Sequence, residues 1–186
     1  MMLDQAILAN SHIIYTHEEI LHSINHIATR LNKEFSGKKV LLLPVLTGAI
    51  PFVGILIPKL TFTMEVNYIH VSRYQDNVGQ AKITLTHEPS ANEIKNQHIL
   101  VVDDILDEGN TMHYIYQRLA QHDPKSITNV ALFEKKINKK KMIEADFYGL
   151  EVDDAYVYGF GLDYNGLGRN IADLYALNNT TVNEKN

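Results

Sequence analysis

Residues 99–111 combine an unbroken apolar run, two acidic pairs and a Gly-x-Thr turn. The run at 99–102 shows no alternation of apolar and polar residues, which predicts a strand buried on both faces, as in a parallel sheet. From Thr111 onward, apolar residues recur at three- and four-residue steps, which predicts a helix. These residues are Met112, Ile115, Tyr116 and Leu119. The acids therefore lie where a buried strand passes into a helix, at the sheet edge where open α/β folds bind ligands.

The chemistry of this turn suits a phosphorylated sugar. The backbone N–H groups of 107–111, the helix dipole and the Thr111 hydroxyl together favour a phosphate. Asp103 and Asp104 cannot bind phosphate directly because like charges repel. They can accept hydrogen bonds from sugar hydroxyls or face a magnesium-bound ligand. A phosphate cradle beside a diol-binding acid pair describes a ribose 5-phosphate site. The alternative is an ordinary solvated acidic loop, which this spacing disfavours.

Composition and charge narrow the class of protein. A chain of 186 residues with 45% hydrophobic residues can bury one full core, so a single domain is expected. A net charge of −5 argues against general nucleic-acid binding. The absence of cysteine excludes disulfides and thiolate catalysis. The N-terminus lacks a secretory signal, and the longest apolar stretch, at 49–57, is too short to span a bilayer. A soluble cytoplasmic protein without a membrane or nucleic-acid partner is expected.

Strand and helix patterns alternate along the chain. Thr16 and Glu19 form a predicted capping box for a helix that ends near Gly37, and Pro51 begins another that ends near Pro58. Residues 74–80 are expected to form a mobile loop and 90–97 a polar connection. Strands are predicted at 40–46, 65–71, 82–86, 99–102, 128–133, 147–150, 155–160 and 174–177. This order predicts an α/β fold with a mainly parallel central sheet, flanked by helices, and a small appendage over its carboxyl edge.

The segment 101–111 resembles the phosphoribosyl-pyrophosphate (PRPP) signature of the type I phosphoribosyltransferases. Further blocks, in the same order, resemble the hypoxanthine-guanine phosphoribosyltransferases. They are Leu46-Thr47-Gly48, Ser72-Arg73-Tyr74, Leu132-Phe133-Glu134-Lys135, and the run from Tyr156 to Tyr164 followed by Arg169. The resemblance implies the type I phosphoribosyltransferase fold, in one domain over 1–186. Its core would cover about 36–150, its hood the N-terminal segment and about 151–177, and a polar tail 178–186.

The resemblance also implies a role for each block. PRPP and its phosphate would be bound by Asp103, Asp104, Asp107, Glu108, Gly109, Asn110 and Thr111, with Asp107 also catalytic. Pyrophosphate would be bound by Leu46, Thr47, Gly48 and Arg169. Ser72, Arg73 and Tyr74 would begin the flexible catalytic loop. The purine would be bound by Lys135, Tyr156, Val157 and Asp163. Magnesium would be held by Asp163, Asp103 and Asp104.

The implied reaction is Mg²⁺-dependent purine salvage. Hypoxanthine, guanine or both would react with PRPP to give IMP or GMP and pyrophosphate, in a homodimer or homotetramer. A lysine ammonium donates to a 6-oxo group and rejects a 6-amino group, so Lys135 would exclude adenine. Asp107 would be the general base for the purine N7 proton. A xanthine-preferring transferase and a PRPP-binding regulator of the same fold remain the alternatives.

Some positions have a second interpretation or depart from the family pattern. Tyr156 could be a core aromatic, and Asp163 could only cap a turn. The lysines Lys139, Lys140 and Lys141 are expected to be solvated charges. Thr47 is neutral where the family usually has a basic residue, and Asp103 replaces a common Glu. Glu108 replaces a small hydroxyl residue, so its side chain must point away from the phosphate.

Overall fold

The computed structural model describes residues 5–75 and 81–178. The elements in chain order are α1 (Gln5–Ala9), β1 (Ser11–Tyr15), α2 (His17–Glu34), β2 (Lys39–Leu46), α3 (Ile50–Leu56), the 3-10 helix η1 (Ile57–Lys59), β3 (Thr63–Val66), β4 (Ile69–Gln75), β5 (Ala81–His87), α4 (Ala91–Ile94), β6 (His98–Leu106), α5 (Asn110–Ala120), β7 (Ser126–Lys135), β8 (Phe147–Val152), β9 (Val157–Tyr158) and β10 (Leu174–Leu177).

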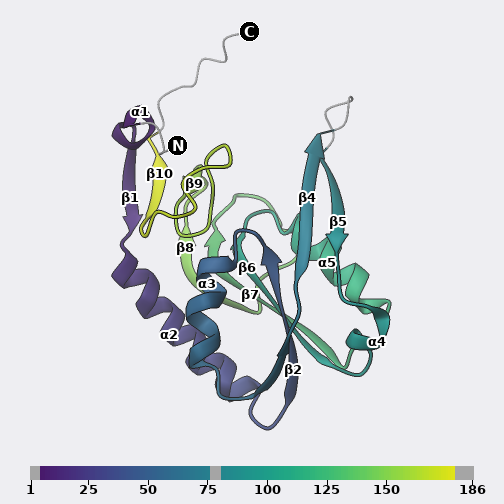
Figure 1. Ribbon diagram of the computed structural model, residues 1–186. Coiled ribbons are helices and arrows are strands. Elements are labelled where there is room, and N and C mark those ends of the chain that lie inside the picture. Colours follow the sequence, from purple (N-terminus) through teal and green to yellow (C-terminus); the bar gives the residue numbers. More distant parts are fainter. Residues whose placement is uncertain (1–4, 76–80, 179–186) are drawn as a thin grey trace.

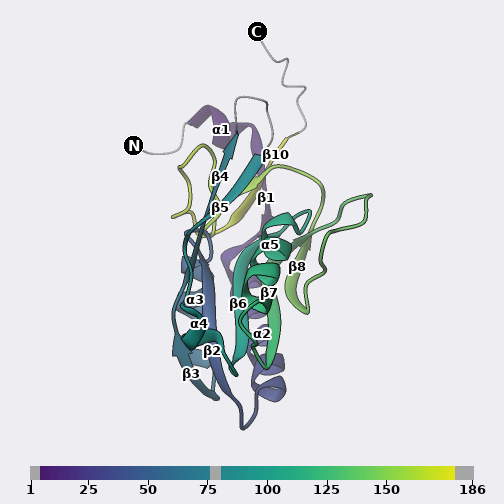
Figure 2. The same ribbon diagram turned by 90° about the vertical axis from the view of Figure 1, so that its right-hand side faces the viewer.

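The main sheet has the strand order β5-β4-β2-β6-β7-β8, and β3 also pairs with β2. Its strand pairs are parallel except for the antiparallel pair β4–β5. Helices α2 and α3 lie on one face, and α4 and α5 lie on the other (Figures 1 and 2). The predicted α/β fold with a mainly parallel sheet and helices on both faces is confirmed.

The central strand β6 shows why its sequence has no polar alternation. Leu100 and Val102 pack into the core beneath α2 and α3, whereas Ile99 and Val101 pack into the core beneath α5. All four side chains are fully buried. A strand covered by helices on both faces needs an apolar side chain at each position.

The helix α2 begins and ends as its sequence predicts. The Thr16 hydroxyl accepts from the Glu19 backbone N–H, and the Glu19 carboxylate accepts from the Thr16 N–H, which completes the capping box. Beyond the helix, Gly37 has a φ of +72°, a left-handed conformation that glycine adopts without strain. One side of α2 packs on the sheet through residues spaced three and four apart: Ile20, Ile24, Ile27 and Leu31.

Several predicted boundaries were wrong. The single strand expected at 65–71 is two strands, β3 and β4, separated at Asn67 and Tyr68. The connection at 90–97 contains α4, with a capping box formed by Ser90 and Glu93. Strand β6 continues past 102 because Asp103 and Ile105 still pair with β7. The strand expected at 155–160 contains only Val157–Tyr158.

A small antiparallel sheet, in the order β1-β10-β9, stands at the carboxyl edge of the main sheet (Figure 1). We call this sheet and the turns at 159–173 the hood. The N-terminal elements α1 and β1 were not predicted, and β1 pairs with β10 from the other end of the chain. Residues 76–80 of the expected loop and 179–186 of the expected tail lie outside the described residues. Where the chain is described, no helix has the length and apolar character needed to cross a membrane.

Candidate active site

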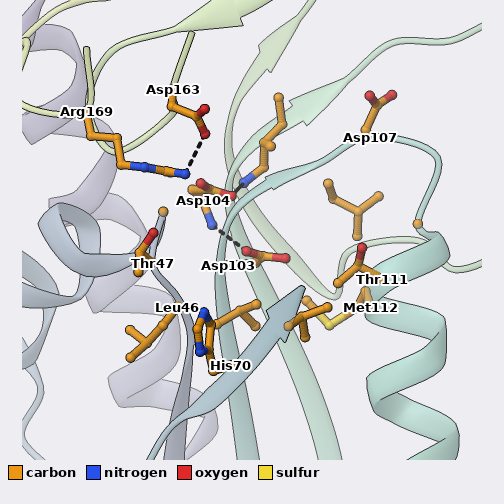
Figure 3. Close-up of a pocket in the computed structure, with 16 residues that line it drawn as sticks. Leu46, Thr47, His70, Asp103, Asp104, Asp107, Thr111, Met112, Asp163 and Arg169 are labelled. Atoms are coloured by element: carbon orange, nitrogen blue, oxygen red, sulfur yellow. Dashed lines mark hydrogen bonds and ion pairs between the residues drawn. The ribbon is translucent and has the colours of Figure 1, made fainter. Parts of the chain in front are cut away.

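A cavity of about 420 Å³ lies between the carboxyl edge of the main sheet and the hood. Strands β2, β4 and β6, the turn before α5 and the hood all contribute to its walls (Figure 3). The predicted site residues that line it are Leu46, Thr47, Gly48, Asp103, Asp104, Asp107, Gly109, Thr111, Asp163 and Arg169. Segments far apart in the sequence thus meet at one edge, as the parallel topology requires.

The first acidic pair belongs to β6 itself. Asp103 is only 8% exposed, and its Oδ1 accepts from the Asp104 N–H at 3.0 Å. Asp104 Oδ1 accepts from the Ile105 N–H at 2.7 Å. Burial raises the pKa of Asp104, although its side-chain interaction with Asp103, the hydrogen bond from the Ile105 N–H and the charge of Arg169 act in the opposite direction. Both side chains face the middle of the cavity in Figure 3.

The turn after β2 packs directly against this pair. The Leu46–Thr47 peptide bond is cis. A Cβ atom on Gly48 would lie 1.6 Å from Asp104 Oδ2, and a Cβ on Gly161 would lie 2.1 Å from the Gly48 carbonyl oxygen. Only glycine lets the turn, β6 and the hood approach so closely. The backbone at Thr47 and Gly48 therefore forms one wall of the cavity.

The second acidic pair lies beyond β6, in the turn that leads into α5. Gly109 caps this helix with a φ of +80°. Asp107 Oδ2 lies 2.9 Å from Lys135 Nζ. Glu108 forms an ion pair with Lys139 and accepts from Asn110 Nδ2 at 2.9 Å. Unlike Asp107, Glu108 does not line the cavity, which agrees with the expectation that its side chain points away.

The lysines after β7 do not behave alike. Lys139 is exposed, but it pairs with Glu108. The Lys141 side chain is 8% exposed, and its Nζ lies 2.8 Å from Glu134 Oε1, whose side chain is 12% exposed. The expectation that Lys141 is a solvated charge was therefore wrong. The chain folds back so that this lysine reaches the end of β7, and sequence spacing alone does not show such a contact.

Of the predicted purine-binding residues, Asp163 lines the cavity, whereas Lys135, Tyr156 and Val157 are not part of its lining. The Lys135 side chain is 13% exposed, and its Nζ lies 4.0 Å from Asp154 Oδ1 as well as close to Asp107. Tyr156 is 50% exposed, so it is not a core aromatic. Its hydroxyl donates to the Asp163 carbonyl oxygen at 3.2 Å, and burial followed by the charge of Asp163 raises its pKa. Val157 is buried in β9.

Arg169 and Asp163 connect the hood to the cavity. Arg169 Nη2 lies 2.5 Å from Asp163 Oδ1 (Figure 3), and Arg169 Nη1 donates to the Gly161 carbonyl oxygen at 2.6 Å. Asp163 Oδ2 also accepts from the Gly166 N–H at 2.7 Å. Asp163 thus caps a turn and lines the cavity at the same time.

Strand β4 contains the three predicted loop residues and one residue of the cavity wall that was not predicted. Ser72, Arg73 and Tyr74, expected to begin a loop, have their backbone in this strand, paired with β5. Their side chains lie outside the described part of the chain. His70, which sequence reasoning missed, lines the cavity and lies opposite Leu46 in the parallel pairing of β2 and β4. The rule that ligands bind at the carboxyl ends of parallel strands could have identified it.

The carboxylates of the cavity suit a hard cation that shares its ligands with a substrate. Within residues 5–75 and 81–178, no three His, Cys, Asp or Glu side chains are grouped to hold a metal by themselves. Asp103, Asp104 and Asp163 nevertheless line one cavity and offer only oxygen atoms. Mg²⁺ is commonly held by one or two carboxylates together with water and substrate phosphates. The donor set fits magnesium in this way.

Comparison with known proteins agrees with this geometry. Residues 10–165 match the family described as phosphoribosyl transferase domain. A hypoxanthine-guanine phosphoribosyltransferase of Bacillus subtilis (strain 168) is 33% identical over 162 residues, covering 86% of this chain and 88% of that protein. A hypoxanthine-guanine-xanthine phosphoribosyltransferase of Tritrichomonas foetus is 31% identical over 160 residues, covering 86% and 87%. A crystal structure of a hypoxanthine phosphoribosyltransferase from Staphylococcus aureus has a TM-score of 0.83 at 26% identity, covering 94% of this chain and 96% of that one.

Proposed function

The chain belongs to the phosphoribosyl transferase family, and we propose that it transfers the phosphoribosyl group of PRPP to hypoxanthine, guanine or both. The products would be IMP or GMP and pyrophosphate. The observation that carries the proposal is the single cavity lined by Asp103, Asp104, the turn before α5 and Arg169. It offers hydrogen-bond acceptors for ribose hydroxyls, backbone donors for a phosphate and a cation for pyrophosphate.

The residues divide the reaction between them. The purine N9 attacks C1 of the ribose as pyrophosphate leaves, through a transition state with oxocarbenium character. Nearby carboxylates favour the positive charge that develops on the ribose, and Arg169 takes up charge on pyrophosphate. Asp107 would accept the N7 proton, and Lys135 would donate to the 6-oxo group. Their contact at 2.9 Å supports these roles because both then reach the same purine.

Magnesium would be held by oxygens of Asp163, Asp103 and Asp104, shared with the ligand. When bound, it would supply positive charge to the pyrophosphate. We propose that Ser72, Arg73 and Tyr74 close over the reacting atoms and exclude water, which would otherwise hydrolyse the activated ribose. Tyr156 would stack on the purine, a role that its 50% exposure allows.

A panel of bases tests the proposal. The protein is incubated with PRPP, Mg²⁺ and, in turn, hypoxanthine, guanine, xanthine, adenine or uracil, and the nucleotide formed is measured. We expect turnover with hypoxanthine or guanine and none with adenine or uracil. Xanthine is included because the Tritrichomonas foetus relative is named for it as well. Tight PRPP binding with no turnover of any base would favour a regulator.

Light scattering of the same sample would test the expected homodimer or homotetramer.

A further inference from the structure

The lysine-rich segment 136–146, which we call the lysine loop, lies against the turn that begins α5. We propose that Lys139 is a positioning residue for the phosphate of PRPP, because it neutralises Glu108 from a loop that is fixed in place on β7. The inference rests on the proposed function, since it assigns the turn at 107–111 to the phosphate. It adds a residue outside the cavity to the machinery that binds PRPP.

The backbone of the lysine loop is packed on the backbone of the turn. The Met142 N–H donates to the Glu108 carbonyl oxygen at 2.9 Å. A Cβ atom on Gly109 would lie 2.7 Å from the Ile143 carbonyl oxygen and 3.0 Å from the Ile143 nitrogen. Contacts this close mean that neither segment can shift without the other. The position of the phosphate-facing N–H groups therefore depends on the position of the loop.

Two anchors hold the lysine loop on β7. Lys141 forms its ion pair with Glu134, with both side chains almost fully removed from solvent. Near the end of the loop, the Asn129 N–H donates to Asp146 Oδ2 at 2.8 Å, and the Asp146 N–H donates to Asn129 Oδ1 at 3.2 Å. A buried ion pair of this kind fixes a geometry more than it adds stability. Lys139 lies between the end of β7 and the first of these anchors, two residues before Lys141, and pairs with Glu108 in the turn.

Charge gives Lys139 its effect on the ligand. Glu108 adds a carboxylate to a turn whose N–H groups would otherwise attract a phosphate dianion. Lys139 and the Asn110 amide both engage this carboxylate, so its charge is balanced and its side chain is held outside the cavity. Without Lys139, the unbalanced charge would lie within a Debye length of the phosphate and would repel it.

A double-mutant cycle tests this assignment. Lys139→Met is made in the native protein and in Glu108→Gln, and PRPP binding is measured by calorimetry, which does not require turnover. Lys139→Met should weaken PRPP binding by about two- to fivefold in the native protein, a range typical of an exposed charge pair. In the Glu108→Gln background the loss should be clearly smaller, because no carboxylate is left for the missing ion pair to release toward the phosphate. Binding of IMP should weaken like that of PRPP, whereas binding of inosine, which has no phosphate, should not change.

Lys140→Met is the matched control, since this exposed neighbour removes the same charge from the loop. It should leave PRPP binding unchanged. Equal losses for Lys139→Met in both backgrounds would overturn the proposal, as would an equal loss for inosine or for Lys140→Met. If no base is turned over but the double-mutant cycle gives the expected binding changes, the transferase activity is rejected and the phosphate assignment is kept.

Discussion

The acidic pairs Asp103–Asp104 and Asp107–Glu108 are close in sequence but have different surroundings. Asp103 and Asp104 lie within β6, and the cation whose charge acts on Asp104 is Arg169 of the hood. Asp107 and Glu108 lie in the turn beyond the strand, where each carboxylate contacts a lysine. Two similar acidic pairs, a few residues apart, thus lie inside the strand at the cavity in one case and are balanced by contact with a lysine in the other.

The difference follows from the part of the ligand that each acidic pair would face. A buried carboxylate beside a cavity is costly, and the cost falls when a cation or a hydroxyl group approaches it. The first pair therefore favours a ligand that brings ribose hydroxyls and magnesium. A turn that receives a phosphate must not offer free negative charge, so the second pair is balanced before the ligand arrives.

The largest expected effect is on the rate of catalysis, at the second pair. Asp107→Asn keeps the size of the side chain and can still accept from Lys135, but it is far too weak a base to take up the purine proton. Loss of a general base typically lowers the rate by about 10²- to 10⁴-fold. We expect kcat to fall within this range at saturating substrates while PRPP binding, measured by calorimetry, is retained. A kcat near that of the native protein across pH would remove Asp107 as the base.

The next effect is on stability, at the anchor of the lysine loop. Lys141→Met leaves Glu134 buried without its cation, which should lower the free energy of unfolding by about 3–5 kcal/mol. Adding Glu134→Leu removes the unpaired charge and should recover most of this loss. Urea denaturation of the two variants, with Lys140→Met as the control, measures both steps. If the double variant is no more stable than Lys141→Met, the loss comes from packing and not from charge.

The third effect is on recognition of the base. Lys135→Ala should lose about 1.5–3 kcal/mol of purine binding, the usual size for a hydrogen bond to a charged group. PRPP binding should change little. Lys136→Ala is the matched control, because Lys136 is exposed and pairs with Glu151 away from the cavity. Equal losses for purine and PRPP would point to misfolding and would contradict the assignment of Lys135.

The sequence predicted the sheet well and the surroundings of the site less well. The apolar run at 99–102 and the capping box at Thr16 are local signals, and both appear as expected. Strand β1 was missed because its exposed residues alternate weakly and its partner β10 lies at the other end of the chain. Burial of Lys141 was missed for the same reason. A run of lysines predicts solvent exposure for each of them, and only the fold shows that Lys141 contacts Glu134.

A smaller effect concerns pH and the first acidic pair. The pKa of Asp104 is raised mainly by burial, so the folded protein holds this proton more tightly than the unfolded chain does. Its contribution to stability is therefore fully present below the ordinary value of 3.8 and is lost as pH rises through the raised pKa. Asp104→Asn should remove this contribution, so that the variant gains stability relative to the native protein as pH rises through that window. Urea denaturation at a series of pH values measures it, and a constant difference between the two proteins would contradict it.

The smallest expected effect concerns Thr47, where this chain lacks the basic residue that the family resemblance leads us to expect. Thr47 and Gly48 lie against Asp104, so a lysine at position 47 would give the first acidic pair a cation comparable to those of the second. It would also face the proposed pyrophosphate subsite. Thr47→Lys should therefore tighten pyrophosphate binding by about 1 kcal/mol, the size of a partly exposed ion pair.

A double-mutant cycle with Arg169 decides whether the two positions share one anion. With Thr47 neutral, binding of PRPP and pyrophosphate depends on the turn's backbone N–H groups, magnesium and Arg169. Arg169→Ala should thus be more damaging in the native protein than in Thr47→Lys, where a second cation remains. The KM for PRPP and inhibition by pyrophosphate are measured for both single variants and the double variant. Because Arg169 also holds Asp163 at 2.5 Å, Arg169→Lys is included to separate loss of charge from loss of that contact. Strict additivity of the Thr47 and Arg169 changes would place Thr47 outside the pyrophosphate subsite. Positive charge near the first acidic pair would then come only from Arg169 and from the magnesium bound with the ligand.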